Sequence, residues 1–322
     1  MTLVTSENDA LRWRVGLVGY GEVGRILAED LRARGVARVA AYDIKLGSVA
    51  EAPLRGHAVA HGVALAGSHA DLAAQSDLLI SAVTASQTVA VARACAEGMA
   101  AGTWFLDFNS ASPGAKQAAA EAIESAGGRY VESAVMTSVP PYRIRVPMLL
   151  GGPRARVLAP LLAPLGFCTQ VVSDRLGVAS ASKMCRSVMI KGLEAMVIES
   201  LATARAYGVE DAVLASLQET FPGIDWDRQA AYFFKRVIQH GRRRAEEMRE
   251  AARTVEEAGL RPWSAAASAE RQAWVADLAD AGVFGSRGEA ASAGSADWRV
   301  EADRILAHLR SSPPKASGSS LP

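Results

Sequence analysis

The first 173 residues alternate short apolar runs with amphipathic segments. The apolar runs predict six buried strands, at residues 15–18, 36–42, 78–83, 104–108, 129–133 and 147–150. The amphipathic segments between them predict helices at 22–34, 87–96 and 113–126. Strands that alternate with helices through short loops are typical of an α/β fold of Rossmann type, with a doubly wound, mostly parallel sheet.

The strand pattern stops near residue 174. Residues 179–207 contain many Ala, Met, Leu and Ile residues and predict one long helix that joins the two domains. Further helices are expected at 211–219, 227–259, 265–281 and 298–310. We therefore expect a flexible N-terminus at 1–11, a Rossmann domain at 12–173, an all-α domain at 174–310 with a flexible insert at 285–297, and a disordered tail at 311–322.

Composition narrows the possible classes of protein. Half of the 322 residues are hydrophobic, which is enough for a sizeable core, and 35 basic residues nearly balance 34 acidic ones. A net charge of +1 argues against a dedicated nucleic-acid binder. No apolar run reaches the ~18 residues of a membrane span, and the polar, acidic N-terminus is unlike a signal peptide. We expect a cytoplasmic protein.

Neither the cysteines nor the histidines show metal-ligand spacing. The three cysteines are widely separated, which predicts reduced, buried thiols. His57 and His61 stand four residues apart between two glycines, and no carboxylate accompanies them in the sequence. We therefore expect no metal site.

A glycine-rich loop follows the first predicted strand and opens the first predicted helix. Its pattern is GxGxxG, which in this context is typical of dinucleotide binding, although a glycine-rich turn without a ligand is the alternative. Gly19 permits the tight turn, Gly21 lets the backbone approach a pyrophosphate, and Gly24 allows close packing of helix and strand. The helix N-terminus supplies amide donors for the anion. Predicted cofactor contacts are Gly19, Tyr20, Gly21, Glu22, Val23 and Gly24.

An acidic residue stands at the distance that this loop requires. Asp43 lies nineteen residues after Gly24, at the end of the second strand. A carboxylate there binds the ribose hydroxyls of an adenosine and repels a 2′-phosphate, which favours NAD over NADP. Lys45 weakens this preference, and an ordinary turn at the strand end is the alternative.

Four segments, in order, make the chain resemble the β-hydroxyacid dehydrogenases, which are related to 6-phosphogluconate dehydrogenase. They are GLVGYGEVG at 16–24, DFNSASP at 107–113, YVESAVMTSVP at 130–140 and GVASASKMCRS at 177–187. The helical remainder resembles a subgroup whose C-terminal domain is similar to DUF1932. The resemblance implies an NAD-dependent dehydrogenase acting on CH–OH groups, with Lys183 as the catalytic acid and base.

The chain departs from the family pattern in three places. Met136, Thr137 and Ser138 stand where the family's substrate loop has Ser-Gly-Gly, Ala179 replaces a glycine, and Ser187 replaces the family's asparagine. We expect the loop residues to contact substrate, but the departures discourage transfer of a substrate from relatives.

The residues around Lys183 support the same role independently. Lys183, Ser187 and Lys191 are spaced i, i+4, i+8 and so share one helix face. Loss of solvation and a second lysine nearby lower a lysine's pKa and suit it to proton transfer. Ser187 would hold the substrate oxygen or orient Lys183, and Lys191 would contact the substrate. The alternative is a solvated Lys183 and an ion pair between Lys191 and Glu194.

A second polar stripe, with His240, Arg243, Arg244 and Glu247, lies on the helix predicted at 227–259. Arginine binds carboxylates and phosphates through two parallel hydrogen bonds, so Arg243 or Arg244 would anchor an anionic substrate and His240 a hydroxyl. The alternative is a solvated face with an Arg243–Glu247 ion pair.

The carboxyl ends of the inner strands supply the remaining candidates. Thr84 and Asn109 are expected to contact the cofactor, and Ser110 the substrate, because ligands of open α/β sheets bind at this edge. Helix starts and caps are the alternatives.

We expect an enzyme that transfers hydride between NAD and a small, anionic or polyhydroxylated alcohol. Alternatives are an imine reductase, a phosphosugar-acid dehydrogenase and a non-catalytic NAD-binding sensor. The apolar helix at 179–207 leads us to expect a homodimer.

Overall fold

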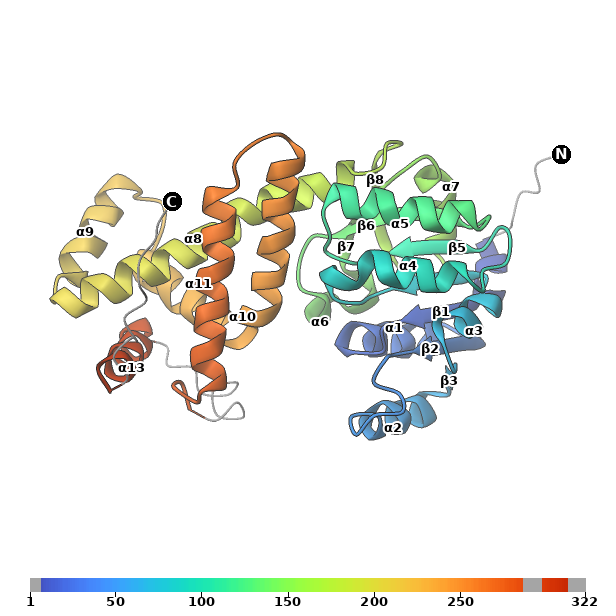
Figure 1. Cartoon of the computed structure of the whole chain (residues 1–322), viewed down its shortest axis with the longest axis horizontal. Helices are drawn as coiled ribbons and strands as arrows, with labels where there is room; N and C mark the ends of the chain where they lie inside the picture. The colour runs from blue at the N-terminus through green and yellow to red at the C-terminus, as the bar shows by residue number, and fades with distance from the viewer. Residues whose placement is uncertain (1–6, 286–296, 312–322) are drawn as a thin grey trace. The chain divides into compact units, whose positions relative to one another are not determined.

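The computed structural model describes residues 7–285 and 297–311 (Figure 1). The predicted flexible insert and tail therefore lie outside the described residues, apart from their end positions, and so do residues 1–6. The rest of the predicted flexible N-terminus is helical, since Glu7–Arg12 form a short 3-10 helix, η1.

Eight strands form one sheet, in the order β3-β2-β1-β4-β5-β6-β7-β8. All neighbours pair in parallel except β6 and β7, which are antiparallel. The predicted doubly wound, mostly parallel sheet is confirmed. The strands are β1 (Arg14–Val18), β2 (Arg38–Tyr42), β3 (Ala64–Leu65), β4 (Leu78–Ser81), β5 (Trp104–Asp107), β6 (Arg129–Val135), β7 (Pro147–Gly151) and β8 (Cys168–Ser173).

Helices cover both faces of this sheet, which explains why its inner strands are apolar without alternation. Leu78 and Ile80 of β4 pack into one core, and Leu79 packs into the other. One core includes α1 (Glu22–Ala33), α2 (Ala52–His61) and α7 (Ala155–Leu162). The other includes α3 (His69–Ala74), α4 (Thr88–Ala96) and α5 (Pro113–Ser125). Short turns η2 (Ala85–Gln87), α6 (Val139–Tyr142) and η3 (Arg143–Arg145) complete this region.

Helix α8 (Val178–Tyr207) is continuous over 30 residues, as predicted for 179–207. The chain divides into two compact units within this helix, between Arg186 and Ser187, and residues 253–260 belong with the first unit. Our expected boundary at 173/174 marked the end of the strands. The boundary between the compact units lies later in the chain because the first turns of α8 pack with the sheet domain.

The second unit is helical and has its own core. Its further helices are α9 (Glu210–Thr220), α10 (Trp226–Glu257), α11 (Trp263–Asp280) and α13 (Trp298–Ser311). Trp226, Phe233 and Phe234 are buried in this core, while Tyr232 and Trp263 are exposed. None of the helices in the described part of the chain has the length and apolar character to cross a membrane.

Candidate cofactor and catalytic site

The glycine loop has the backbone geometry that its spacing predicts. Gly19 adopts a φ of +88°, and its N–H donates to the Tyr42 carbonyl at 2.9 Å, so β1 turns tightly beside β2. A methyl group on Gly24 would overlap the Gly19 carbonyl oxygen, which means that α1 begins in contact with the turn. A methyl group on Gly21 would meet no protein atom within 4 Å. The loop therefore leaves space at Gly21, where a pyrophosphate approaches in dinucleotide-binding folds.

The first turn of α1 is suited to an anion. Gly21 is its N-cap residue and provides no side-chain cap to the first backbone N–H groups. Glu22 is exposed and Val23 is half-buried, so neither side chain is enclosed in the core at the start of α1.

Asp43 lies directly after β2 and is fixed beside the loop. Its carboxylate accepts from the Tyr20 N–H at 2.9 Å and from the Lys45 N–H at 3.0 Å. Two amide donors hold the group in one orientation, while its remaining lone pairs are sufficient for ribose hydroxyls.

The Tyr20 side chain does not face the loop. It is fully buried, and its hydroxyl lies 2.8 Å from Nδ1 of His57. Burial raises the pKa of Tyr20 to about 12. Only the backbone of Tyr20 is therefore available to a dinucleotide.

The two polar residues after β4 and β5 lie in different surroundings. Asn109 is buried; its amide nitrogen donates to Ser81 Oγ at 3.0 Å, and its side-chain oxygen accepts from the Val83 N–H at 2.8 Å. These bonds fasten the ends of β4 and β5 together. Thr84 is exposed.

Lys183 reaches the same sheet edge from the second turn of α8. Its Nζ lies 2.5 Å from Ser110 Oγ, and both residues are half-buried. The sequence assigned Ser110 and Lys183 separately to substrate binding and proton transfer, and the fold brings them into contact.

A buried carboxylate holds the start of α8. Glu132 of β6 accepts from the Gly177 N–H at 2.8 Å, the Ala179 N–H at 3.1 Å and the Ser180 hydroxyl at 2.8 Å. A negative charge at a helix N-terminus satisfies amides that have no partner within the helix and interacts favourably with the dipole. Glu132 thereby fixes the turn that precedes Lys183. The sequence analysis missed this role.

A further polar network joins β5, α5 and β6. Lys116 and Asp107 are fully buried and form an ion pair of 2.8 Å, and the Tyr130 hydroxyl donates to Asp107 at 2.6 Å. Burial, followed by the charge of Asp107, raises the pKa of Tyr130 well above its ordinary value. The sequence analysis missed these residues as well. The only available signal was a carboxylate inside an otherwise apolar strand.

The substrate-loop residues follow β6. The Met136 N–H donates to the Pro147 carbonyl at 3.0 Å, which continues the pairing of β6 with β7. Met136 is half-buried, Thr137 is exposed, and Ser138 is the N-cap residue of α6 without a side-chain capping bond. All three residues are therefore accessible to a ligand.

The predicted stripe beyond Lys183 lies in the second unit and forms ion pairs there. Lys191 Nζ donates to Ser187 Oγ at 3.0 Å and pairs with Glu247 at 2.9 Å. Burial lowers the pKa of Lys191, although the charge of Glu247 opposes the shift. Lys191 therefore pairs with Glu247 and not with Glu194, the partner that the sequence analysis named as the alternative.

Glu194 pairs with Arg244 instead. Both side chains are almost completely buried, and Arg244 Nε donates to Glu194 Oε2 at 2.8 Å. Arg243 is exposed and pairs with Glu247 at 2.8 Å, which is the predicted alternative to a substrate clamp. His240 is exposed on the same helix.

Comparison with known proteins identifies both parts of the chain. Residues 14–172 match the NAD binding domain of 6-phosphogluconate dehydrogenase, and residues 204–275 match a domain of unknown function, DUF1932. A conserved hypothetical protein from Sinorhizobium meliloti 1021 is 42% identical; the match covers 80% of this chain and 87% of that one, with a TM-score of 0.67.

Two more distant structures share the architecture. The conserved protein MTH1747 of unknown function, described as structurally similar to 3-hydroxyacid dehydrogenases, is 29% identical over 83% of this chain and 99% of that one, with a TM-score of 0.63. A 3-hydroxyisobutyrate dehydrogenase from Mycobacterium tuberculosis, solved with L-serine, is 17% identical over 91% of this chain and 99% of that one, with a TM-score of 0.61. The second likeness concerns the fold alone. The chain belongs to the 3-hydroxyacid dehydrogenase-like proteins in which an NAD-binding domain of the 6-phosphogluconate dehydrogenase type is followed by a DUF1932 domain.

Proposed function

We propose that this protein is an NAD-dependent oxidoreductase that interconverts an alcohol and a carbonyl compound, with Lys183 as general acid and base. The observation that carries the proposal is the 2.5 Å contact between Lys183 Nζ and Ser110 Oγ. It places an amine and a hydroxyl at the carboxyl end of β5, in the same compact unit as the glycine loop.

The residues of the loop fit a dinucleotide. Gly21 leaves open space, the first turn of α1 lacks a side-chain cap, and Asp43 is fixed by two amide donors. The loop amides would hold a pyrophosphate, and Asp43 would accept from ribose hydroxyls. The bound nicotinamide supplies hydride acceptance or donation.

Lys183 would manage the proton in this reaction. In the oxidation of an alcohol, its neutral amine takes the hydroxyl proton while the carbon–oxygen bond gains double-bond character. In the reverse direction, its ammonium returns the proton to the oxygen. General acid–base catalysis by a positioned side chain contributes about 10²–10⁴-fold to a rate.

Ser110 is the proposed helper of Lys183. Its hydroxyl contacts the amine directly, whereas the hydroxyl of Ser187 accepts a hydrogen bond from Lys191. Ser110 would orient Lys183 and hold the substrate oxygen next to it. Arg244 is not among the proposed substrate contacts, because Glu194 engages its guanidinium.

The choice of NAD rests on Asp43. A carboxylate at the end of the second strand repels the 2′-phosphate of NADP. We expect Asp43→Ala to lose affinity for NADH and to narrow the difference between NADH and NADPH, as measured by fluorescence titration of both. An unchanged ratio of the two affinities would contradict this role.

The catalytic proposal is tested by a hydride-transfer screen of wild type and Lys183→Ala. The substrates are hydroxy acids, sugar acids, aryl β-hydroxy compounds and cyclic amines, each with NAD and NADP. We expect turnover of one hydroxy compound with NAD, and a loss of at least about 10²-fold in Lys183→Ala. The control is Lys235→Ala, an exposed lysine of α10.

Two outcomes would overturn the proposal. Turnover of cyclic amines with NADPH alone, undiminished in Lys183→Ala, would make the protein an imine reductase. Binding of NADH without turnover of any compound would favour a sensor.

A further inference from the structure

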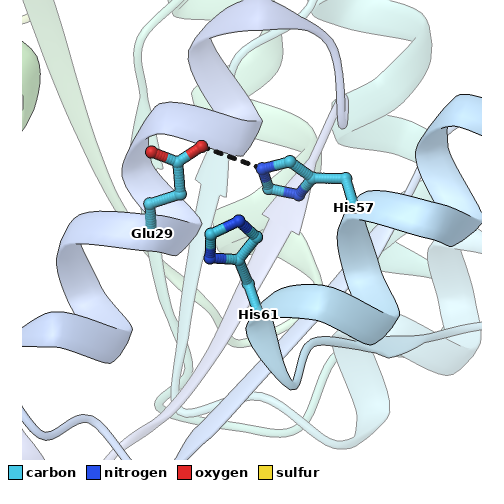
Figure 2. Close-up of side chains that lie close together, drawn as sticks. All are labelled: Glu29, His57 and His61. Atoms are coloured by element: carbon cyan, nitrogen blue, oxygen red, sulfur yellow. Dashed lines mark hydrogen bonds and ion pairs between the residues drawn. The ribbon is translucent and has the colours of Figure 1, made fainter.

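Two histidines and a glutamate of the first unit point toward one another (Figure 2). His57 and His61 lie one turn apart on α2, and Glu29 lies on α1. One ligand atom from each residue lies within 4.8 Å of the others. The two imidazole rings are stacked, with centroids 4.3 Å apart. All three side chains are half-buried, so an ion has access to them and is partly shielded from water.

We propose that Glu29, His57 and His61 bind one divalent transition-metal ion, with Zn²⁺ as the best match. Imidazole nitrogens and a carboxylate oxygen are a common ligand set for zinc, and three protein ligands leave a fourth position for water. Zinc–ligand bonds of about 2.0–2.2 Å place tetrahedral donor atoms about 3.3 Å apart. Because the donor atoms already lie within 4.8 Å, rotation of side chains is sufficient to close the site.

The donor atoms have suitable orientations. His57 directs Nε2 to Glu29 Oε1 at 2.9 Å, and an ion would replace this hydrogen bond. The other ring nitrogen, Nδ1, lies 2.8 Å from the hydroxyl of the buried Tyr20. Metal-binding histidines generally use their second nitrogen for such a bond, which fixes the orientation of the ring. Within the described part of the chain, the His61 nitrogens have no hydrogen-bond partner.

Charged side chains of α1 and η3 surround the three proposed ligands. Glu29 is a carboxylate at neutral pH, since the ordinary pKa of a glutamate side chain is about 4.3. Arg143 donates to Glu29 Oε2 at 2.6 Å and to Asp30 Oδ1 at 2.7 Å, so it engages the other oxygen of Glu29 than His57 does. Arg32 donates to the His61 carbonyl at 3.3 Å, so two guanidiniums balance the two carboxylates around the site. Glu29 Oε1 remains directed at His57.

The test is a titration of the full, tag-free chain with Zn²⁺ after removal of metal by a chelator. Binding is measured by calorimetry in a Cys168→Ser, Cys185→Ser background, because these exposed thiols are competing zinc ligands. We expect one equivalent of zinc and a rise in melting temperature, since a ligand of the native state stabilises it. Co²⁺ should give visible d–d bands without a thiolate charge-transfer band.

Variants separate this site from adventitious binding. His61→Ala and Glu29→Gln should each weaken zinc binding at least about 10-fold, and Tyr20→Phe about 10-fold through loss of the bond to His57. His308→Ala, in the second unit, is the matched control and should bind as the parent does. Circular dichroism of each variant checks its fold.

Absence of zinc binding by the parent protein would overturn the proposal. Equal binding by parent and His61→Ala would do the same and would assign the zinc to other residues. If a variant fails to fold, the Co²⁺ spectrum of the parent protein is the test instead. Visible d–d bands without a thiolate charge-transfer band support the proposal, and their absence contradicts it.

Discussion

Two lysines on one face of α8 have different partners in the two units of the protein. Lys183 in the first unit contacts the Ser110 hydroxyl at the edge of the sheet. Lys191 in the second unit is buried and pairs with Glu247. The nearby Arg244 likewise pairs with a buried carboxylate, Glu194.

The difference shows that a shared helix face does not imply a shared role. Buried cations that face carboxylates hold α8 and α10 together, and removal of one member leaves an uncompensated charge. A lysine that contacts a hydroxyl at the same sheet edge as the glycine loop is suited to exchange a proton. We therefore propose a stabilising role for Lys191 and Arg244 and a catalytic role for Lys183. The four predictions below separate residues that stabilise the fold from residues that bind or react.

The largest expected effect on stability is that of Arg244→Ala. It leaves Glu194 buried without its ion-pair partner, so we expect the free energy of unfolding to fall by about 3–5 kcal/mol. Urea denaturation measures the change. Arg243→Ala is the matched control: its side chain is 57% exposed, and its ion pair contributes at most about 1 kcal/mol. If Arg244→Ala had normal stability and a raised substrate KM, the result would instead support the prediction that Arg244 anchors an anionic substrate.

Glu132→Ala should have the next largest effect. It removes the acceptor of two backbone N–H groups and the Ser180 hydroxyl at the start of α8, which costs about 2–4 kcal/mol. Because the same turn positions Lys183, we also expect kcat to fall while NADH affinity is retained. Ser180→Ala, which removes only one of the three bonds, should destabilise by about 1 kcal/mol. Equal losses in the two variants would show that Glu132 does not cap the helix.

Within the glycine loop, two substitutions to alanine should separate folding from cofactor binding. Gly24→Ala forces a methyl group against the Gly19 carbonyl and should lower the unfolding free energy by about 1–3 kcal/mol. Gly21→Ala meets no protein atom, so its stability should change by less than about 0.5 kcal/mol. Its NADH dissociation constant should nevertheless rise. Normal NADH binding by Gly21→Ala would place the pyrophosphate elsewhere.

The smallest effect concerns pH. The pKa of Tyr130 is raised in the folded state, so its contribution to stability is complete below pH ~10 and is lost as pH rises above that value. One such group lowers the free energy of unfolding by up to about 1.4 kcal/mol for each pH unit above that value. Tyr130→Phe should therefore flatten the decline in unfolding free energy above pH ~10, whereas Tyr207→Phe, an exposed tyrosine, should not. If the unfolding free energies of wild type, Tyr130→Phe and Tyr207→Phe declined in parallel, Tyr130 would not be a source of the pH dependence.

Most elements of the fold were predictable because their signals are local. The β1–loop–α1 unit depends on an apolar run, three glycines and an amphipathic helix, all within twenty residues. The elements that the sequence analysis did not predict, such as α2, α7 and β8, are short or mix apolar with polar residues. Their apolar side chains become interpretable only once the neighbouring strands are in place.

The sequence by itself determined the doubly wound fold, the dinucleotide loop, the acidic residue after β2 and the lysine of α8. Each follows from backbone requirements or from a fixed spacing along the chain. Only the tertiary structure decided which charges pair and which donor atoms converge. It brought Glu29 to His57 and His61, where the sequence showed two histidines without a carboxylate, and it paired Lys191 with Glu247 instead of Glu194. Such choices depend on distances across separate elements, since ion pairs and ligand sets form between side chains that are distant in sequence.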